Sequence, residues 1–426
     1  MEITDLYLKP SFFQEQKQCE FRIPKRKIYS NNIYLEKIGF INSAGNLQYN
    51  TLAGALGVIK SAVLLDNGVE IDSCKNCGAL SAFKNKLRPT KRIINKLDPE
   101  KSARTAFSFK TVIADTKAIT NQIIGPIDSE LIKTTEALTE DAIVPLSFFF
   151  PILNQLPSVD TNLFTDLRVR LEFSSDRFDL FNVQNVATYS QIVPVMRLQE
   201  IEDPKLSASM AIKSNVSWIA YEHDRYVIPA NAGSATGQEQ TTSVRMNGIR
   251  NKSIGRVLIQ KGYSTTGAET TSGDYGNFAS RSLFKEKIQV RVNGSNLFAE
   301  GGLGGDKVMD IMAVTTDAFG EYTMIPYEGE HGIGPGPVDN DYTNWKVNTY
   351  LDARRLNKGS YIGFHVQGKA NDFFIEHKRT CVTGDTNLAS MGSAGSASLA
   401  SLNVNVYFEV KKMLMVKDNK YVVQYM

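Results

Sequence analysis

The sequence contains few of the residues that usually carry catalysis, metal binding or covalent cross-links. Its 426 residues include 4 Cys, 4 His and 2 Trp. So few cysteines cannot form the disulfide framework of a small secreted domain, so we expect a reducing compartment. Cys74 and Cys77 form one close pair, but a structural zinc needs four ligands and no second pair lies nearby in the sequence. We therefore predict no metal site and no cofactor.

Recognisable catalytic motifs are also missing. The sequence has no Gly-x-Ser-x-Gly nucleophile elbow and no two histidines at i, i+4. Residues 54–61 resemble a phosphate-binding loop only faintly, because the Gly-Lys dipeptide is absent. Carboxylates are plentiful, but no spacing selects a catalytic pair. These absences favour a protein that is not an enzyme and leave a β-sandwich hydrolase as a minor alternative.

A strong charge imbalance is lacking too. The formal net charge is +3, which is too small to indicate nucleic-acid binding by the chain as a whole. Two local basic clusters exist, one formed by Lys25, Arg26 and Lys27 and the other within residues 84–92. Either could touch nucleic acid, although a solvated surface loop is the favoured interpretation of both.

Long hydrophobic runs and a secretory signal are also missing. The longest apolar stretch, residues 142–153, spans about 12 residues, whereas a membrane helix needs about 20. Residues 1–5 have neither the basic segment nor the apolar segment of a secretory signal. We expect synthesis in the cytoplasm.

What the sequence does contain is one pattern that occurs twice. Residues 63–71 and 288–298 each place Asn-Gly between alternating apolar residues, which is the strongest short-range signal of a β-hairpin. Each hairpin is followed by a helix-like segment and then by an alternating strand. These segments are 146–156 and 163–173 in the first half, and 348–356 and 360–367 in the second. Two halves of about 200 residues each, in the same order, indicate a duplicated β-rich domain.

Strand patterns dominate, and long helical patterns are few. Residues 166–173 alternate strictly between apolar and charged side chains, and residues 402–411 alternate between Val or Phe and polar side chains or Tyr. We therefore predict an all-β fold made of two jelly-roll β-sandwiches in tandem, with short helices in the connecting loops.

The predicted domain organisation has three parts. Residues 1–27 form an N-terminal arm, 28–203 the first jelly roll, and 204–426 the second, with a linker at 202–215. Prolines and phenylalanines in the arm indicate a segment that becomes ordered against something else. Four polar loops are expected to tolerate insertion, and most of them are expected to face outward. These loops are 230–243, 264–281, 328–343 and 383–401.

Several stretches, in their order and spacing, resemble a known family. They are 21–26 leading to 33–40, the hairpin around Asp66-Asn67-Gly68, 148–157 running into 163–173, Trp218–Pro229, and 403–413. Over most of its length the chain resembles the double jelly-roll major capsid proteins of tailless icosahedral double-stranded DNA viruses. The polinton-like viruses, virophages and adintoviruses are nearest, and adenoviruses and tectiviruses are more distant.

This resemblance implies a structural protein of the virion. Homotrimers of such a protein form pseudo-hexagonal capsomers that tile an icosahedral shell, next to penton and minor capsid proteins. Lys25, Arg26 and Lys27 would lie on the inner face, towards genome or membrane, while a host receptor is left open. The alternative is a receptor- or carbohydrate-binding β-sandwich, such as a fibre or lectin-like protein. The two tryptophans, Trp218 and Trp345, lend that alternative little support.

Overall fold

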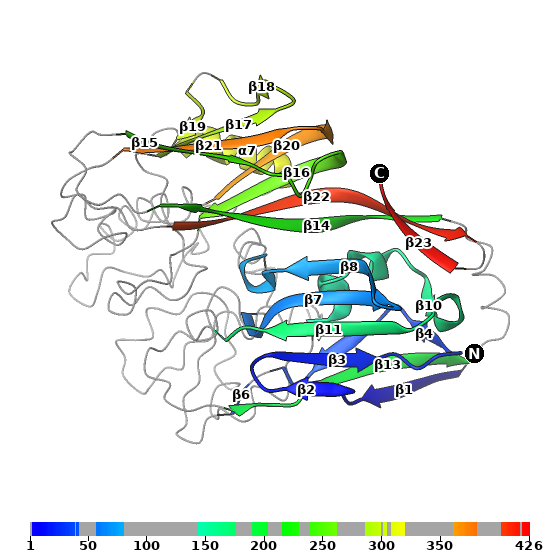
Figure 1. Cartoon of the computed structure of the whole chain (residues 1–426). Helices are drawn as coiled ribbons and strands as arrows, with labels where there is room; N and C mark the ends of the chain where they lie inside the picture. Colours follow the sequence, from blue (N-terminus) through cyan, green and yellow to red (C-terminus); the bar gives the residue numbers. More distant parts are fainter. Residues whose placement is uncertain are drawn as a thin grey trace, which may run out of the picture.

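The computed structural model describes thirteen stretches of the chain and the strand pairings among them. The described ranges are 2–38, 40–41, 57–80, 144–175, 190–202, 215–229, 239–261, 286–299, 301–304, 308–319, 361–380, 402–417 and 420–426. Every strand pairing within these ranges joins two strands of the same half of the chain. The halves are termed the N-terminal roll and the C-terminal roll (Figure 1). None of the described helices is long and apolar enough to cross a bilayer.

The N-terminal roll contains two main antiparallel sheets. Sheet 1 consists of β1 (Glu2–Leu8), β4 (Ile28–Ser30), β5 (Tyr34–Glu36), β9 (Val144–Pro145), β10 (Ser158–Asp160) and β13 (Val195–Glu202). Sheet 2 has the order β2 (Phe12–Gln14), β3 (Gln18–Arg22), β11 (Leu167–Phe173), β7 (Ile59–Asp66) and β8 (Val69–Lys75). A small third pair joins β6 (Phe40–Ile41) to β12 (Ser190–Gln191).

Local sequence explains the main features of this roll. In β11 the apolar side chains Leu167, Val169, Leu171 and Phe173 are all buried, as the alternation predicts. Asn67 and Gly68 connect β7 and β8 with φ of 49° and 81°, so the predicted hairpin is confirmed. The predicted helix-like segment 146–156 contains two short 3₁₀ helices, η4 (Leu146–Phe148) and η5 (Pro151–Asn154).

The N-terminal segment is not an arm, so the prediction for residues 1–27 was wrong. Strand β1 pairs with β13 along its whole length, from Glu2 opposite Glu202 to Leu8 opposite Met196. Strand β3 pairs with β11, and its Cys19 is fully buried. The prolines that suggested an arm lie in the connections between short strands, where no ladder hydrogen bond is lost. The first roll therefore includes these residues.

The C-terminal roll also contains two antiparallel sheets. Sheet 3 consists of β14 (Asn215–Ile228), β22 (Leu402–Lys417), β16 (Lys252–Lys261), β20 (Tyr361–Ala370) and β23 (Lys420–Tyr425). Sheet 4 consists of β15 (Glu239–Arg245), β21 (Phe373–Thr380), β17 (Glu286–Val292), β18 (Ser295–Asn296) and β19 (Leu303–Gly304). Helix α7 (Val308–Phe319) packs on β20, where the absent side chain of Gly363 leaves room for Phe319.

The predictions for this half have mixed outcomes. The hairpin within 288–298 is confirmed, and the strand predicted at 360–367 lies in β20. Residues 239–243, predicted as part of a loop, belong to β15 instead, because they pair with β21. The helix-like segment 348–356, the remaining predicted polar loops and the residues between β13 and β14 lie outside the described residues.

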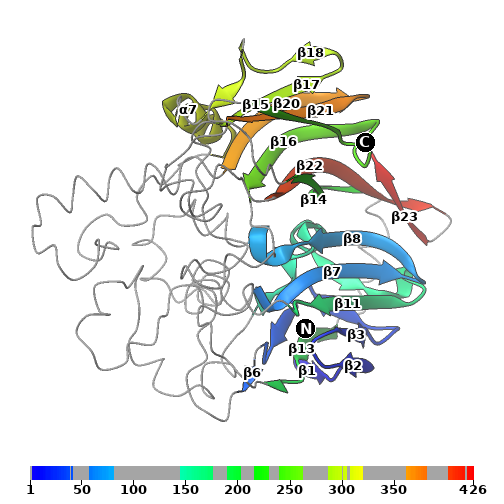
Figure 2. The ribbon, with the colours of Figure 1, turned by 60° about the vertical axis from the view of Figure 1, so that its left-hand side comes forward.

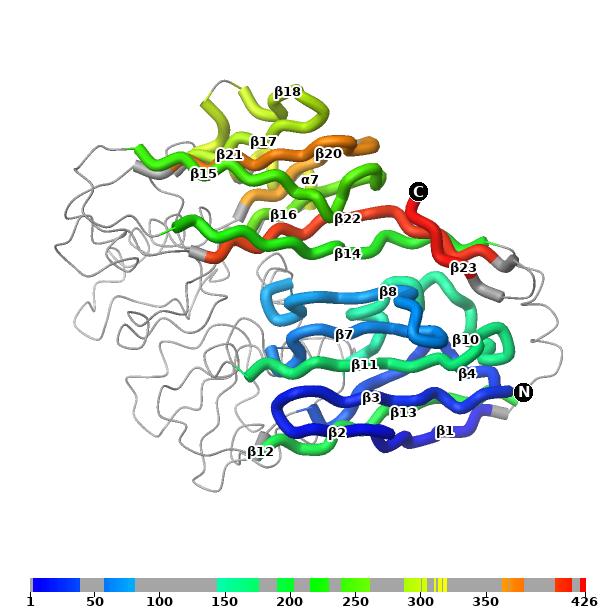
Figure 3. The backbone as a smooth tube through the Cα atoms, in the orientation of Figure 1, coloured from blue at the N-terminus to red at the C-terminus, as the bar shows by residue number. Residues whose placement is uncertain are grey.

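The two rolls share one plan. In each, the first strand pairs with the last long strand, β1 with β13 and β14 with β22. In each, the Asn-Gly hairpin forms one edge of the second sheet, in the orders β3-β11-β7-β8 and β15-β21-β17-β18. The tube in Figure 3 follows this repeated path. The structure thus confirms the duplicated β-sandwich that the sequence predicts.

The rolls lie side by side and touch through specific elements. Strand β8 and helix η5 of the N-terminal roll pack against β14 of the C-terminal roll, and Figures 1 and 2 both show β8 beside β14. Strand β18 lies on the side of the C-terminal roll that faces away from the N-terminal roll (Figure 1). Both chain termini lie towards the same end of the molecule (Figure 1).

Candidate functional site

The structure offers no catalytic or metal-binding arrangement among the residues it describes. No group of three His, Cys, Asp or Glu side chains in these ranges could hold a metal ion. Cys74 and Cys77 are buried free thiols, and the Cys77 thiol donates to the Cys74 carbonyl at 3.2 Å. Burial raises the pKa of Cys77, so the thiol stays protonated and is a poor metal ligand or nucleophile. The most informative polar site is instead the junction between the two rolls.

A buried ionic cluster lies at the centre of this junction. Asp72 on β8 is fully buried, and Lys412 on β22 is 2% exposed. The Lys412 Nζ lies 3.9 Å from Asp72 Oδ1 and 3.3 Å from Glu222 Oε1 on β14. One lysine therefore faces two carboxylates, one from each roll. Buried charges remain in a fold only when they are paired, so this cluster ties the position of β8 to that of β22.

The C-terminal strand completes the cluster. The Tyr425 hydroxyl donates to Glu222 Oε1 at 2.9 Å, and the Tyr425 ring lies 4.1 Å from Lys252 Nζ and 5.1 Å from Lys412 Nζ. Both lysines thus make cation–π contacts with the same ring. The backbone of Met426 holds the strand end in place, because it donates to the Lys411 carbonyl and accepts from Ser253.

The pKa values of the two carboxylates shift in opposite directions. Burial raises the pKa of Asp72 to about 7, because loss of water outweighs the attraction of Lys412. Burial also acts to raise the pKa of Glu222, but Lys412, Lys252 and the Tyr425 hydroxyl lower it overall. Lys412 therefore lies between Glu222, which ionises readily, and Asp72, which ionises only near neutral pH.

A second set of contacts passes through Asn76, which directly follows β8. Its Nδ2 donates to Asn405 Oδ1 at 3.0 Å, and its carbonyl accepts from the Tyr407 hydroxyl at 2.9 Å. His223 Nε2 lies 3.0 Å from the same Asn405 oxygen. Burial lowers the pKa of His223, so the ring is neutral and donates through Nε2. Asn76 itself has φ of 51°, a conformation that asparagine tolerates better than most residues.

Sheet 3 carries a further buried ion pair near this junction. Arg256 Nη2 donates to Glu409 Oε1 at 2.6 Å, and the Tyr221 hydroxyl donates to the same carboxylate at 2.8 Å. Glu409 is 4% exposed. Arg256 also donates to the Ala318 carbonyl, which connects helix α7 to the sheet. Arg256 Nε also donates to Glu409 Oε2, and this bidentate geometry fixes orientation as well as contributing energy.

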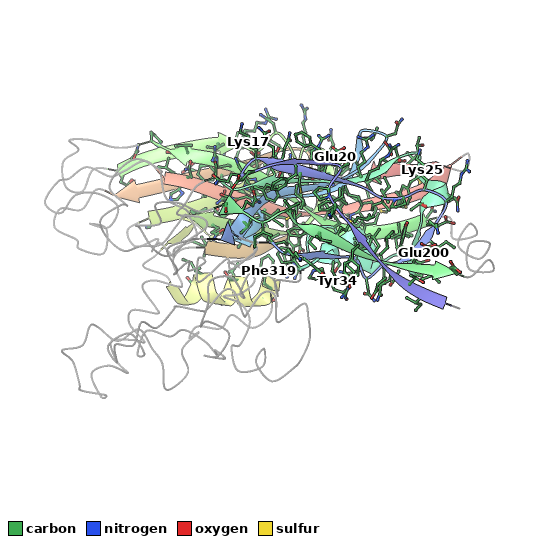
Figure 4. All side chains as sticks on the ribbon, turned by 90° about the horizontal axis from the view of Figure 1, so that it is seen from below. Lys17, Glu20, Lys25, Tyr34, Glu200 and Phe319 are labelled. Carbon is green, nitrogen blue, oxygen red and sulfur yellow. The ribbon has the colours of Figure 1, made fainter. Side chains whose placement is uncertain are left out.

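Lys25, Arg26 and Lys27 lie in the tight connection between β3 and β4, and all three are exposed. The Lys27 ammonium forms an ion pair with Glu200. The backbone amide of Lys27 donates to the Thr161 hydroxyl, and that hydroxyl donates to the Lys27 carbonyl. Figure 4 shows Lys25 and Glu200 at the same end of the roll. The cluster is therefore attached to a folded sheet rather than to an arm. The basic residues within 84–92 lie outside the described residues.

An ion-pair ladder that the sequence analysis missed crosses sheet 2. Glu20 accepts from Arg168 at 2.8 Å and from Arg170 at 3.0 Å, while Asp166 accepts from Arg22 at 2.8 Å. Burial acts to raise the pKa of Glu20, but the two arginines lower it overall. Figure 4 places Glu20 and Tyr34 on opposite sides of the N-terminal roll. Charged residues of both signs at every second position of β3 and β11 are the signal that could have found this ladder.

The tryptophan evidence for sugar binding is weak. Trp218 is 3% exposed and lies in β14, the strand that meets β8 and η5. It cannot serve as an exposed stacking platform for a sugar ring. Trp345 lies outside the described residues.

Comparison with solved structures identifies the architecture. No protein-family model and no curated protein sequence matches this chain. Among solved structures, VP54 of the virus PBCV-1, fitted into a reconstruction of the virophage Sputnik, has a TM-score of 0.56 and 13% identity, covering 100% of this chain and 97% of that chain. A chain from the structure of the Sputnik virophage has a TM-score of 0.58 and 10% identity, covering 100% of this chain and 88% of that chain. The mavirus major capsid protein has a TM-score of 0.52 and 10% identity, covering 99% of this chain and 90% of that chain.

The chain has the double jelly-roll fold. The likeness extends over both rolls. At these identities it establishes the fold, as the resemblance predicted.

Proposed function

We propose that this protein is a major capsid protein, a structural subunit of an icosahedral virion. The observation that carries this proposal is the match of the whole double jelly roll to capsid proteins over nearly the full length of both chains. Two rolls with one plan are joined by a buried polar junction into one block. Such a block is suited to assembly with identical copies in a shell. The described residues contain no cluster of side chains that could hold a metal ion.

The finer proposal is a homotrimer. Three copies of a chain with two similar rolls give six rolls around one axis, and hence a capsomer of pseudo-hexagonal outline. In a closed ring, each surface that binds a neighbouring copy is occupied. Adjacent capsomers, together with penton and minor capsid proteins, would complete the shell.

Sedimentation of the purified protein tests the trimer, and electron microscopy tests the shell. The expected species has three times the chain mass of 47.3 kDa. Negative-stain images should show hexagonal blocks or closed particles. A monomer at every protein and salt concentration, with no particles formed, would contradict the proposal.

We also propose that Lys25, Arg26 and Lys27 face the interior of the shell, towards genome or membrane. Support comes from their exposure and from their place at one end of the N-terminal roll (Figure 4). A basic residue near an anionic membrane contributes about 1 kcal/mol. The Lys27–Glu200 pair reduces the share of Lys27, so Lys25 and Arg26 carry most of the proposed contact.

A further inference from the structure

A polar depression lies on the outward face of sheet 4. Ile288 and Val290 on β17 are buried against sheet 3. Strand side chains alternate between the two faces of a sheet, so Lys287 and Arg291 point outward, and both are exposed. These two cations line the depression, which has a volume of about 160 Å³. One ordered water needs only about 10–15 Å³, so the depression has room for a larger ligand.

The side chain of Gln289 fixes one wall of this depression. Its Nε2 donates to the carbonyls of Phe298 at 3.2 Å and Ala299 at 3.3 Å, and its Oε1 accepts from the Phe298 amide at 3.3 Å. These bonds hold the segment that leads to Gly301, which also lines the depression, against β17. The shape of the depression is therefore set before any ligand binds.

The charges that line the depression are not balanced by the part of the chain that the structure describes. Lys287 lies directly opposite Lys378 on β21, and only Lys378 has a carboxylate partner, Glu376, in these ranges. Arg291 Nε donates to Asn296 Oδ1 at 3.4 Å, but Arg291 forms no ion pair within the described residues. Like charges on adjacent strands repel, so an anion bound here would be stabilised.

The equivalent face of the N-terminal roll does not have this imbalance. There each arginine of the ion-pair ladder has a carboxylate partner. On β7, the strand equivalent to β17, the outward side chains Ser61 and Val63 are uncharged. The shared plan of the rolls therefore does not require unpaired cations at this place, which favours a binding role for Lys287 and Arg291.

We propose that this depression binds an acidic carbohydrate, whose acidic groups contact Lys287 and Arg291 and whose hydroxyl groups donate to Glu376. Lys287 and Arg291 are four residues apart on an extended strand, a separation of about 13 Å. Glu376 lies between them, in the register position opposite Gln289. The surface thus presents a cation, a hydrogen-bond acceptor and a second cation in that order. This proposal does not rest on the capsid function.

The carboxylate between the two cations selects the class of ligand. The Lys378 ammonium contacts Glu376 Oε1 at 3.1 Å, which leaves Oε2 as an acceptor for a sugar hydroxyl. In an acidic carbohydrate, hydroxyl groups lie between the acidic groups. A polynucleotide has a phosphate at every nucleotide and would bring one towards Glu376, where like charges repel. The arrangement therefore favours an acidic carbohydrate over a nucleic acid.

Binding of defined oligosaccharides to the full-length protein tests the proposal. The probes are a sulfated heparin-type oligosaccharide, a hyaluronan oligosaccharide of equal length, which has carboxylates but no sulfates, and neutral maltohexaose. Calorimetry at physiological salt should detect binding of at least one acidic probe and no binding of maltohexaose. The acidic probe that binds more tightly shows whether sulfate or carboxylate is the preferred group.

Removing the two cations should weaken this binding. Lys287→Gln with Arg291→Gln should lower the affinity roughly tenfold or more, because two charge-assisted contacts are lost. The melting temperature should be unchanged, because both side chains are exposed. Lys17→Gln with Lys60→Gln removes the same charge at exposed positions of sheet 2 and is the matched control, which should bind as wild type does.

Glu376→Ala separates a specific site from general attraction of anions. The substitution makes the surface more positive, so general attraction would strengthen binding of the acidic probe. The proposal instead expects severalfold weaker binding, because the acceptor for the sugar hydroxyl is lost. Tighter binding by this variant would overturn the proposal.

Three other results would also overturn it. They are no binding of either acidic probe, an equal loss of affinity in the matched control, and tighter binding of a single-stranded oligonucleotide that the Lys287 and Arg291 substitutions abolish. None of these results would contradict the capsid proposal, because sedimentation and electron microscopy test that function separately. The depression lies on the sheet that carries β18, on the side of the C-terminal roll away from the N-terminal roll (Figure 1), so probes can reach it in the isolated protein.

Discussion

Replacing Asp72 with Asn should make the stability of the protein less sensitive to pH. The pKa of Asp72 rises from 3.8 to about 7 on folding. The folded protein therefore holds this proton more tightly than the unfolded chain, and wild-type stability falls as pH rises from about 4 to 7. The size of this effect is about 4 kcal/mol, at about 1.4 kcal/mol for each tenfold change in proton affinity. Asn cannot ionise, so the stability of the variant does not fall with pH for this reason.

The substitution also changes hydrogen bonds, in a manner that does not depend on pH. Asp72 accepts from the backbone of Ser73 at 3.0 Å and of Ile152 at 3.4 Å, and an amide can replace only one of these acceptors. Losing one buried bond costs about 1–3 kcal/mol. We therefore expect Asp72→Asn to be less stable than wild type at pH 4.5 and at least as stable at pH 8.

Urea unfolding of both proteins across this pH range measures the effect. The expected result is a free-energy difference that shifts by about 4 kcal/mol in favour of the variant between pH 4 and 8. Titration of Glu222 and His223 should be largely common to both proteins and so cancel in the difference. A difference that stays constant with pH would refute the reasoning, since Asp72 would then be charged in the fold, fully compensated by Lys412.

Three further predictions concern the fold and the proposed inner surface. Phe21→Ala should lower the free energy of unfolding by about 3–5 kcal/mol, because Phe21 is fully buried, and an unchanged melting temperature would restore the arm interpretation. Tyr407→Phe should cost about 1 kcal/mol, because it removes one of the two hydrogen bonds to the Asn76 carbonyl and leaves the one from the Leu80 amide, and chemical denaturation would show no change if the Tyr407 contact is absent. Lys25→Ala with Arg26→Ala should leave the melting temperature within a degree or two but weaken co-sedimentation with anionic vesicles and with DNA. Unchanged binding to both would argue against an inner-face role for these residues.

Local patterns were enough to predict the plan of the fold. The Asn-Gly turns require positive φ at both residues, so they predict two hairpins, and both are present. The strict alternation in β11 predicts a half-buried strand in the same way. The alternation in β22 predicts the strand but not its burial, because Asn405, Tyr407 and Glu409 are buried too. In both cases the signal lies in adjacent residues and does not depend on what packs against them.

The N-terminal strands could not be predicted in this way because their partners are distant in the sequence. Strand β1 is fixed by β13, and β3 is fixed by β11, so nothing adjacent to them distinguishes a strand from an arm. Their short length and the intervening prolines also resemble a linker. Pairing across the whole roll was the missing information.

The junction between the rolls was missed for a related reason. In β22, Lys412 continues the same alternation as the buried Val406, Val410 and Leu414, and a lysine in that phase is a signal of a buried charge. The signal does not say which partner neutralises the charge. Asp72 belongs to the other roll, and sequence spacing carries no information about contacts between domains.

The pairing of first and last strands has a consequence for synthesis on the ribosome. Strand β1 leaves the ribosome before β13 and must wait for it, and β14 must likewise wait for β22. Each roll therefore closes only when its own final strand has emerged, and such distant pairing is slow. The N-terminal roll can close while the second is still being made, but β8 then presents Asp72 to solvent until β22 arrives with Lys412. Until β22 emerges, the surface of the N-terminal roll that packs against the C-terminal roll is uncovered. We therefore expect chaperones to bind the nascent chain at this stage of translation.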